Sequence, residues 1–246
     1  MISKIAKFAY LMWYMLKTII RPGEANEFFG NIYQNVKKNL LKQVEISDLF
    51  PGIHETRVTF YKTDWEYGGV DLRELYLLSA LVKQSKSQNI FEIGTFKGTT
   101  TLHLAVNSEP NTRIFTLNLP VSSMPSAESV SFDHKTKFEE EAQTGEKYRG
   151  TDVAPKIIQL YGDSAVYDFT PFYNRMDFVF VDGSHQYEFV KKDSMNAFKL
   201  LKENGLILWH DYGRAGVTKA LDEISRQKTI YQIKGTSLAI FMNHSK

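Results

Sequence analysis

The feature that most constrains the fold is a short segment, residues 89–101, with the sequence NIFEIGTFKGTTT. The apolar run that opens it is typical of a buried strand, and the residues from Thr99 onward follow a helical pattern. The glycines allow a tight turn between these two elements and close approach of a ligand to the backbone. A strand, a glycine loop and a helix N-terminus together predict a ligand-binding corner of an α/β protein.

The spacing of this segment is Glu-x-Gly-x-x-x-Gly, from Glu92 to Gly98, and not the Gly-x-Gly-x-x-Gly of dinucleotide-binding folds. The acid precedes the first glycine, where we expect it to face the ligand. A carboxylate there favours a ligand with a positive group over a pyrophosphate. Taken alone, the segment leaves open an ordinary strand-turn-helix with no ligand.

Composition excludes several classes of protein. The chain has 246 residues, which is enough for one α/β domain with additions, and its hydrophobic content of 43% is ordinary for a soluble protein. A net charge of +2 gives no electrostatic case for a nucleic-acid partner. The absence of cysteine excludes disulfides, thiolate zinc sites and a cysteine nucleophile. We expect a cytoplasmic protein.

The N-terminal residues 1–21 carry four basic residues and no acid, and their apolar residues recur at helical spacing. The uninterrupted apolar run, Phe8 to Leu16, is too short to span a bilayer. We expect an amphipathic helix here, and we favour its packing on its own domain or on a second subunit of a homo-oligomer over contact with a membrane. Peripheral membrane contact through residues 1–21 stays open, and with it membrane association.

Strands and helices then alternate, which predicts a doubly wound parallel sheet. The predicted strands are residues 90–93, 113–117, 156–161, 178–181, 206–209, 229–233 and 238–242. The predicted helices between and before them are residues 70–83, 99–106, 187–201 and 217–225. A long polar connection, about residues 119–155, indicates an insertion or lid over the ligand. Residues 1–72 form the N-terminal amphipathic helix and a capping segment.

Polar residues follow five successive predicted strands. They are Glu92 with Gly94, then Asn118, Asp163, Asp182 and Asp211. Ligands of open α/β sheets bind at the carboxyl ends of the strands, where these residues would gather. Because each of them costs desolvation unless it has a partner, stability alone explains the coincidence poorly. We therefore predict a ligand site at this edge.

Two further motifs, DGSHQY at residues 182–187 and LKENGLILWHDY at residues 201–212, make the pattern more specific. Together with the glycine loop, they resemble class I S-adenosylmethionine (SAM) methyltransferases of an O-methyltransferase subgroup. That subgroup is similar to macrocin-type sugar O-methyltransferases and, more distantly, to catechol O-methyltransferase. The resemblance covers residues 70–242. It implies a Rossmann-like, seven-stranded, mostly parallel sheet with an antiparallel last strand, and makes residues 73–246 the SAM-binding domain.

The resemblance also implies a set of cofactor-binding residues. The loop after the first strand would hold the amino acid end of SAM. Asn118 stands where most class I members carry an acid for the ribose hydroxyls, and an amide makes weaker bonds there. The implied set is Glu92, Gly94, Thr95, Phe96, Gly98, Thr99 and Asn118, with Asp163 and Ser164 on the adenine side and Asp182 beside the methyl group.

The implied catalytic residues are His185, Asp182 and Asp211. A histidine at the position of His185 is the proposed base of the sugar-methylating relatives, and a neutral imidazole suits that task. In metal-dependent relatives, acids matching Asp182 and Asp211 bind magnesium. The residues beside the second acid, His210 and Tyr212, are poor magnesium ligands, so a divalent metal such as Mg²⁺ stays open. We expect His210 to line the site.

The predicted function is SAM-dependent transfer of a methyl group to a hydroxyl of a small molecule, which is a sugar, a natural product or a phenol. Two other classes stay open. One is a non-catalytic SAM-binding or membrane-associated partner protein, for which residues 1–21 argue. The other is a nucleotide-sugar or NAD enzyme on a similar sheet, against which the glycine spacing argues.

Overall fold

The computed structural model describes residues 40–61, 69–120 and 144–243. The predicted N-terminal helix, residues 1–21, and most of the predicted lid lie outside these ranges. Within them, no helix has the length and apolar character needed to cross a membrane.

The described residues form one eight-stranded sheet with the order β1-β7-β8-β6-β5-β2-β3-β4. The strands are β1 (Lys42–Val44), β2 (Asn89–Ile93), β3 (Arg113–Asn118), β4 (Ile157–Tyr161), β5 (Met176–Val181), β6 (Leu201–Trp209), β7 (Ile230–Ile233) and β8 (Ala239–Met242). Only β8 runs antiparallel to its neighbours, β6 and β7. The predicted α/β sheet with an antiparallel last strand is therefore confirmed.

The predicted number of seven strands is wrong by one, because β1 adds an edge strand. It pairs in parallel with β7, where Gln43 lies opposite Gln232. The strand has only three residues, and two of them are exposed. Such a short, polar segment has no alternating apolar pattern, so the sequence gives no strand signal there.

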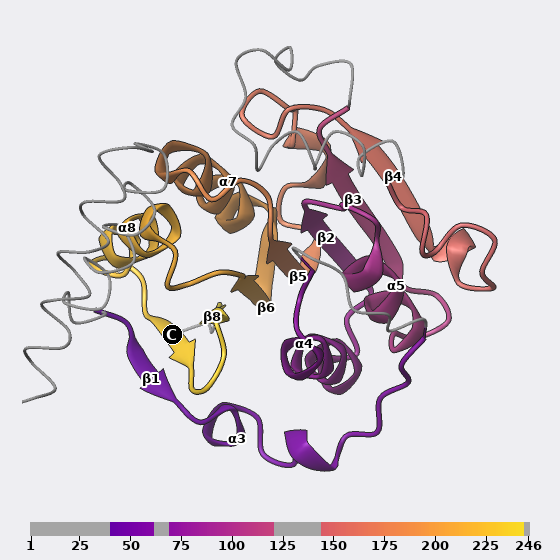
Figure 1. The fold of residues 1–246 in the computed structure, drawn as a ribbon, viewed down its shortest axis with the longest axis horizontal. Coiled ribbons are helices and arrows are strands. Elements are labelled where there is room, and N and C mark those ends of the chain that lie inside the picture. The colour runs from indigo at the N-terminus through magenta and orange to yellow at the C-terminus, as the bar shows by residue number, and fades with distance from the viewer. Residues whose placement is uncertain (1–39, 62–68, 121–143, 244–246) are drawn as a thin grey trace, which may run out of the picture.

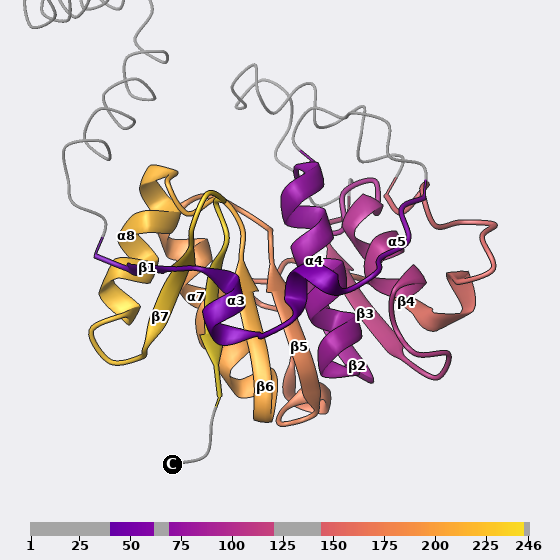
Figure 2. The same cartoon turned by 90° about the horizontal axis from the view of Figure 1, so that it is seen from below.

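Helices cover both faces of the sheet (Figures 1 and 2). The α-helices are α3 (Ile46–Leu49), α4 (Leu72–Ser85), α5 (Thr99–Val106), α7 (Tyr187–Leu200) and α8 (Ala215–Ile224), and the 3₁₀ helices are η1 (Ile53–Glu55), η4 (Ala154–Lys156) and η5 (Thr170–Phe172). Helices α4 and α5 lie on one face of the sheet, and α7 and α8 lie on the other.

Strand β5 shows how the core is divided between the two faces. Phe178 and Phe180 pack in the cluster that includes α4 and α5, whereas Val179 and Val181 pack in the cluster that includes α7 and α8. All four side chains are buried. A parallel strand covered on both faces reads as a continuous apolar run, which is why this strand is evident in the sequence.

The strand order reverses between β2 and β5. The chain runs outward from β2 through β3 to β4 and then returns to β5 on the other side of β2. A crevice opens where the loops after two such strands diverge. At this point a Cβ on Gly94 would lie 2.1 Å from the carbonyl oxygen of Asp182, and Gly94 has a φ of 102°. A glycine is therefore required where the two loops meet.

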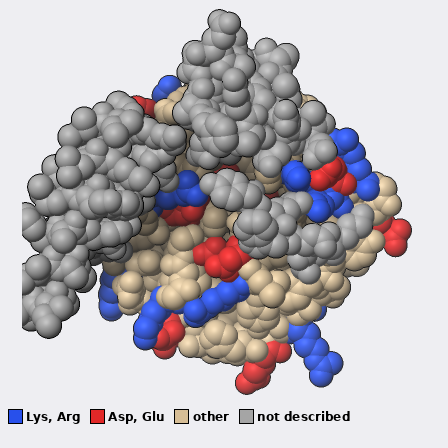
Figure 3. Space-filling view, viewed as in Figure 1, with Lys and Arg blue, Asp and Glu red and all other residues tan. Residues whose placement is uncertain are grey.

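Charged side chains of both signs are mixed on the face shown in Figure 3. The ion pairs Lys191–Glu223 and Lys234–Glu45 are examples of exposed pairs in this protein. Pairs of this kind contribute little to stability, because water and salt screen them.

Candidate active site

The glycine loop between β2 and α5 is held in place by Asn118, the last residue of β3. The carboxamide oxygen of Asn118 accepts the backbone N–H groups of Thr95 at 3.2 Å and Phe96 at 3.3 Å. Its nitrogen donates to the hydroxyl of Thr144 at 3.1 Å. The side chain thus joins the loop to Thr144, which lies within the predicted lid. Contact between Asn118 and a ribose stays a prediction.

Glu92 lies inside β2, and its carboxyl group is fully buried. One oxygen, Oε2, accepts the hydroxyls of Thr101 at 2.5 Å and Thr116 at 2.6 Å. The other oxygen, Oε1, has no hydrogen-bond partner among the described residues. Burial raises the pKa of Glu92 to about 8, against the two hydroxyls, which lower it. The carboxyl is therefore mostly protonated at neutral pH, with one oxygen left for a donor.

The predicted adenine-side residues follow β4. Asp163 Oδ1 accepts the backbone N–H of Ala165 at 2.8 Å and stabilises the turn. Asp193 of α7 is a buried acid near Ser164. Burial raises the pKa of Asp193 to about 6, and Ser164 works in the opposite direction. Sequence reasoning missed Asp193, although its place between Val190 and Ala197 on the apolar face of the helix is an available signal.

The three predicted catalytic residues come together at the ends of β5 and β6. His185 Nε2 lies 2.6 Å from Asp211 Oδ2, and Asp182 reaches the same group of side chains. Asp211 also receives the guanidinium of Arg214, whose Nε lies 3.1 Å from Oδ1. The backbone of Asp211 is left-handed, with a φ of 59°. Such a backbone is uncommon for residues other than glycine and is enriched at functional sites.

His210 lies at the centre of this group and contacts three acids. Its Nδ1 lies 3.2 Å from Asp182 Oδ1 and 3.4 Å from Asp211 Oδ2. Its Nε2 lies 2.9 Å from Glu74 Oε2. The other oxygen of Glu74 accepts the backbone N–H of Ser237 at 2.5 Å. A chain of contacts therefore runs from α4 to His185.

These contacts decide the charges of the group. Burial lowers the pKa of His210, but Asp182, Asp211 and Glu74 raise it by more, so it lies well above its usual range. Burial raises the pKa of Asp211, but hydrogen bonds from His185 and His210 hold it below its usual range. The pKa of Glu74 is lowered in the same way by His210. His210 is thus an imidazolium among carboxylates.

Sequence reasoning missed Glu74 and gave His210 only a lining role. Glu74 is 136 positions away from His210 in the chain, and only the packing of α4 on the sheet brings them together. The available signal was an acid next to Leu75, on the apolar face of a predicted helix. The side chain of Glu74 is buried. A buried acid on such a face needs a partner.

An open cavity of about 540 Å³ lies beside this group. His210 and Asp211 line one part of it, and Gln43 of β1 and Gln232 of β7 line another. No aromatic side chain other than His210 lines this cavity within the described residues. The edge strand β1, absent from the predicted fold, thus contributes to a polar pocket at the candidate site.

Known methyltransferases are similar to this chain in sequence and in fold. Residues 91–212 match the family model of a methyltransferase domain. This range includes the glycine loop, Asp182, His185 and Asp211. The chain therefore contains a methyltransferase domain over these residues. No curated protein sequence matches it significantly.

Solved structures show the same fold. The O-methyltransferase TomG from Streptomyces achromogenes, involved in tomaymycin synthesis and solved with SAM, is 17% identical and has a TM-score of 0.55 over 90% of this chain and 98% of its own. The SAH-bound methyltransferase PaMTH1 from Podospora anserina is 16% identical, with a TM-score of 0.51 over 73% and 81%. A methyltransferase from Geobacter sulfurreducens is 15% identical, with a TM-score of 0.50 over 72% and 81%.

The acids of the methyltransferase do not offer a ready magnesium site. The ligand atoms of Asp182, His185 and Asp211 all lie within 4.8 Å of one another. Asp211 Oδ1 and Oδ2 already contact Arg214 and His185, and Asp182 Oδ1 contacts His210. Magnesium prefers oxygen ligands, whereas one imidazole with two carboxylates suits transition metals better. The group therefore fits magnesium poorly.

Proposed function

We propose that the methyltransferase transfers the methyl group of SAM to a hydroxyl of a small molecule, with His185 as general base. The observation that carries this proposal is the contact of 2.6 Å between His185 Nε2 and Asp211. In this contact, Asp211 accepts a hydrogen bond from Nε2–H and fixes the orientation of the imidazole ring. Nδ1 is then the nitrogen that takes the proton of the acceptor. Asp211 also stabilises the imidazolium that forms, as a carboxylate does in other histidine bases.

The donor side of the proposal rests on the groups around the glycine loop. Gly94 to Gly98 and the N-terminus of α5 would hold the amino acid end of SAM, with Glu92 Oε1 free for its ammonium group. Asp163 and Ser164 would contact the adenine. When bound, SAM supplies a methyl group on a sulfonium, which is a good leaving group. The protein aligns the acceptor oxygen with the methyl carbon and removes one proton.

The acceptor hydroxyl would lie at His185, and the rest of the acceptor would extend into the polar cavity beside His210 and Asp211. Its walls carry amides and hydroxyls, such as Gln43, Gln232 and Thr236, which bind hydroxyl groups well. The C–S bond breaks as the new C–O bond forms, and the hydroxyl proton passes to His185 Nδ1. The products are a methyl ether and the thioether form of the donor.

The direct test of this function is transfer of an isotope-labelled methyl group from SAM to panels of sugars, natural products and phenols. We expect label on an acceptor oxygen, and the same rate when EDTA is present, because the carboxylate oxygens contact protein cations. A rate that falls with EDTA and returns with Mg²⁺ would instead make Asp182 and Asp211 metal ligands. Transfer to nitrogen or carbon alone would contradict O-methylation.

A Glu92→Gln substitution tests the donor side. We expect the Kd for SAM to rise by about tenfold, because the amide cannot become the carboxylate that an ammonium group favours. The pKa of about 8 means that the wild-type protein releases a proton on binding SAM at pH 7, whereas the variant does not. Isothermal titration in two buffers with different ionisation enthalpies measures both effects. Glu109→Gln, at an exposed position, is the matched control.

A further inference from the structure

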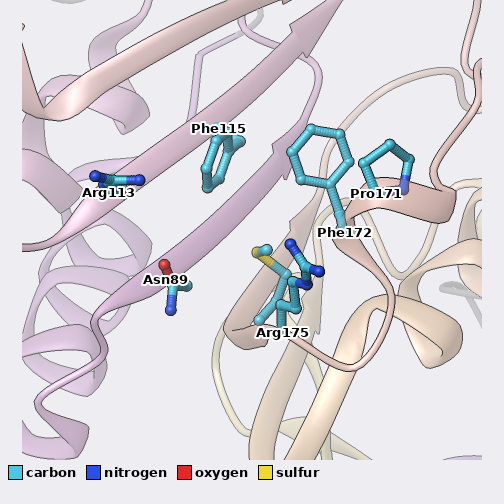
Figure 4. Close-up of a pocket in the computed structure, with 7 residues that line it drawn as sticks. Asn89, Arg113, Phe115, Pro171, Phe172 and Arg175 are labelled. Atoms are coloured by element: carbon cyan, nitrogen blue, oxygen red, sulfur yellow. The ribbon is translucent and has the colours of Figure 1, made fainter.

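A second cavity lies at the amino ends of the strands, opposite the carboxyl ends that carry the candidate active site (Figure 4). Its volume is about 530 Å³, within the usual range for small-molecule sites. Asn89, Arg113 and Met176, the first residues of β2, β3 and β5, contribute to its lining. These strands are parallel, and β2 has five residues, so the length of the strand, about 15 Å, separates this cavity from the glycine loop.

The floor of this cavity is aromatic and held in place. Phe115 and Phe172 are half-buried, and their ring centroids lie 5.0 Å apart at an angle of 60°. Phe172 also packs edge-on against the buried ring of Phe91, at 5.2 Å. Met176 adds a thioether, which adapts to the shape of a neighbouring group. Contacts with two rings fix Phe172, so the apolar wall is preformed.

The rim of the cavity is positively charged. Figure 4 shows Arg113 on the side of Phe115 and Arg175 on the side of Phe172. Both residues are exposed, and none of the ion pairs among the described residues involves either guanidinium. The nearby acid, Asp177, is already bound, because Lys202 Nζ lies 2.5 Å from its Oδ1. Among the described residues, this cavity is therefore lined by two guanidinium groups and by no carboxylate.

We propose that this cavity is a second ligand site for an aromatic anion. A planar ring would lie against Phe115 and Phe172, where stacked and edge-on contacts are favourable. Its carboxylate or phosphate would bind Arg113 and Arg175, whose planar groups match such anions in geometry. The carboxamide of Asn89 supplies a further donor and acceptor. The ligand is not the methyl acceptor, because the length of the sheet separates it from His185.

The test is isothermal titration of the full-length protein with benzoate and, separately, with phenyl phosphate. We expect saturable binding at one site for the better of the two probes, and at least about tenfold weaker binding in Arg113→Gln and in Arg175→Gln. Tighter binding of benzoate identifies a carboxylate ligand, and tighter binding of phenyl phosphate identifies a phosphate ligand. Cyclohexanecarboxylate, which is not planar, is expected to bind more weakly than benzoate.

The matched control is Arg226→Gln, which removes one exposed positive charge elsewhere and should leave binding unchanged. Thermal unfolding of each variant confirms that the fold is intact, and the two arginines are exposed enough for this to be expected. No saturation with either probe would overturn the proposal. Equal weakening by Arg226→Gln would also overturn it, because binding would then follow net charge and not this cavity.

Discussion

A His185→Ala variant is expected to lose about 10²–10⁴-fold in turnover, with any acceptor that the wild-type protein methylates, while its affinity for SAM stays within about twofold. The reason is that the variant removes the only group in the proposed mechanism that takes the hydroxyl proton. The side chain of His185 is 33% exposed, so its removal leaves the core intact. Single-turnover methyl transfer, together with titration of SAM, separates the two effects.

Two further variants sharpen this test. His185→Gln keeps a hydrogen bond to Asp211 but has no basic nitrogen, so we expect it to be as slow as the alanine variant. His54→Ala removes an exposed histidine of η1 and serves as the matched control. Unchanged turnover in His185→Ala would eliminate the base assignment. Equal loss of turnover and of SAM affinity would instead indicate that His185 organises the donor site.

The sequence predicts well those elements whose signal is local. The apolar run of β5 and the glycine loop after β2 each carry their pattern within a few residues, and both are where expected. Helix α5, predicted as residues 99–106, has these bounds in the structure. The rule that polar residues gather at the carboxyl ends of parallel strands is enough to bring Asp182, His185 and Asp211 together. The proximity of these three side chains could therefore be predicted without knowledge of the tertiary packing.

The parts that the sequence does not predict depend on packing between distant segments. Glu74 meets His210 only because α4 packs on the sheet, and nothing near Glu74 in the sequence indicates that contact. The hydrogen bonds from Thr95 and Phe96 to Asn118 are equally hard to predict, because they arise from the pairing of β3 with β2. Edge strand β1 is too short to show any periodicity. Motifs therefore identify a site residue more readily than the partners that fix it.

The position of His210 changes the meaning of the two acids beside it. In the sequence, Asp182 and Asp211 suggest a pair that a metal ion neutralises. In the structure, His210 contacts both of them, and Arg214 contacts the second. The protein thus supplies its own cations to this acidic group. An imidazolium that neutralises carboxylates in a partly buried place contributes to stability as well as to the geometry of the site.

A His210→Ala variant is therefore expected to lower the free energy of unfolding by about 3–5 kcal/mol, the usual cost of leaving a buried acid without its partner. Glu74, with 3% of its surface exposed, would keep the backbone N–H of Ser237 but would lose its cationic partner. Urea unfolding followed by circular dichroism measures the change. Arg214→Ala removes an exposed cation from the same Asp211 and should cost far less, since its side chain is 53% exposed.

The double variant Glu74→Gln with His210→Ala decides whether the uncompensated charge is the cause. A neutral glutamine side chain in place of Glu74 carries no buried charge, so we expect the double variant to recover part of the stability lost by His210→Ala alone. Strict additivity of the two single changes would contradict this, and would assign the loss to the cavity left by the imidazole. A loss below about 1 kcal/mol in His210→Ala would show that water reaches Glu74 and replaces the histidine.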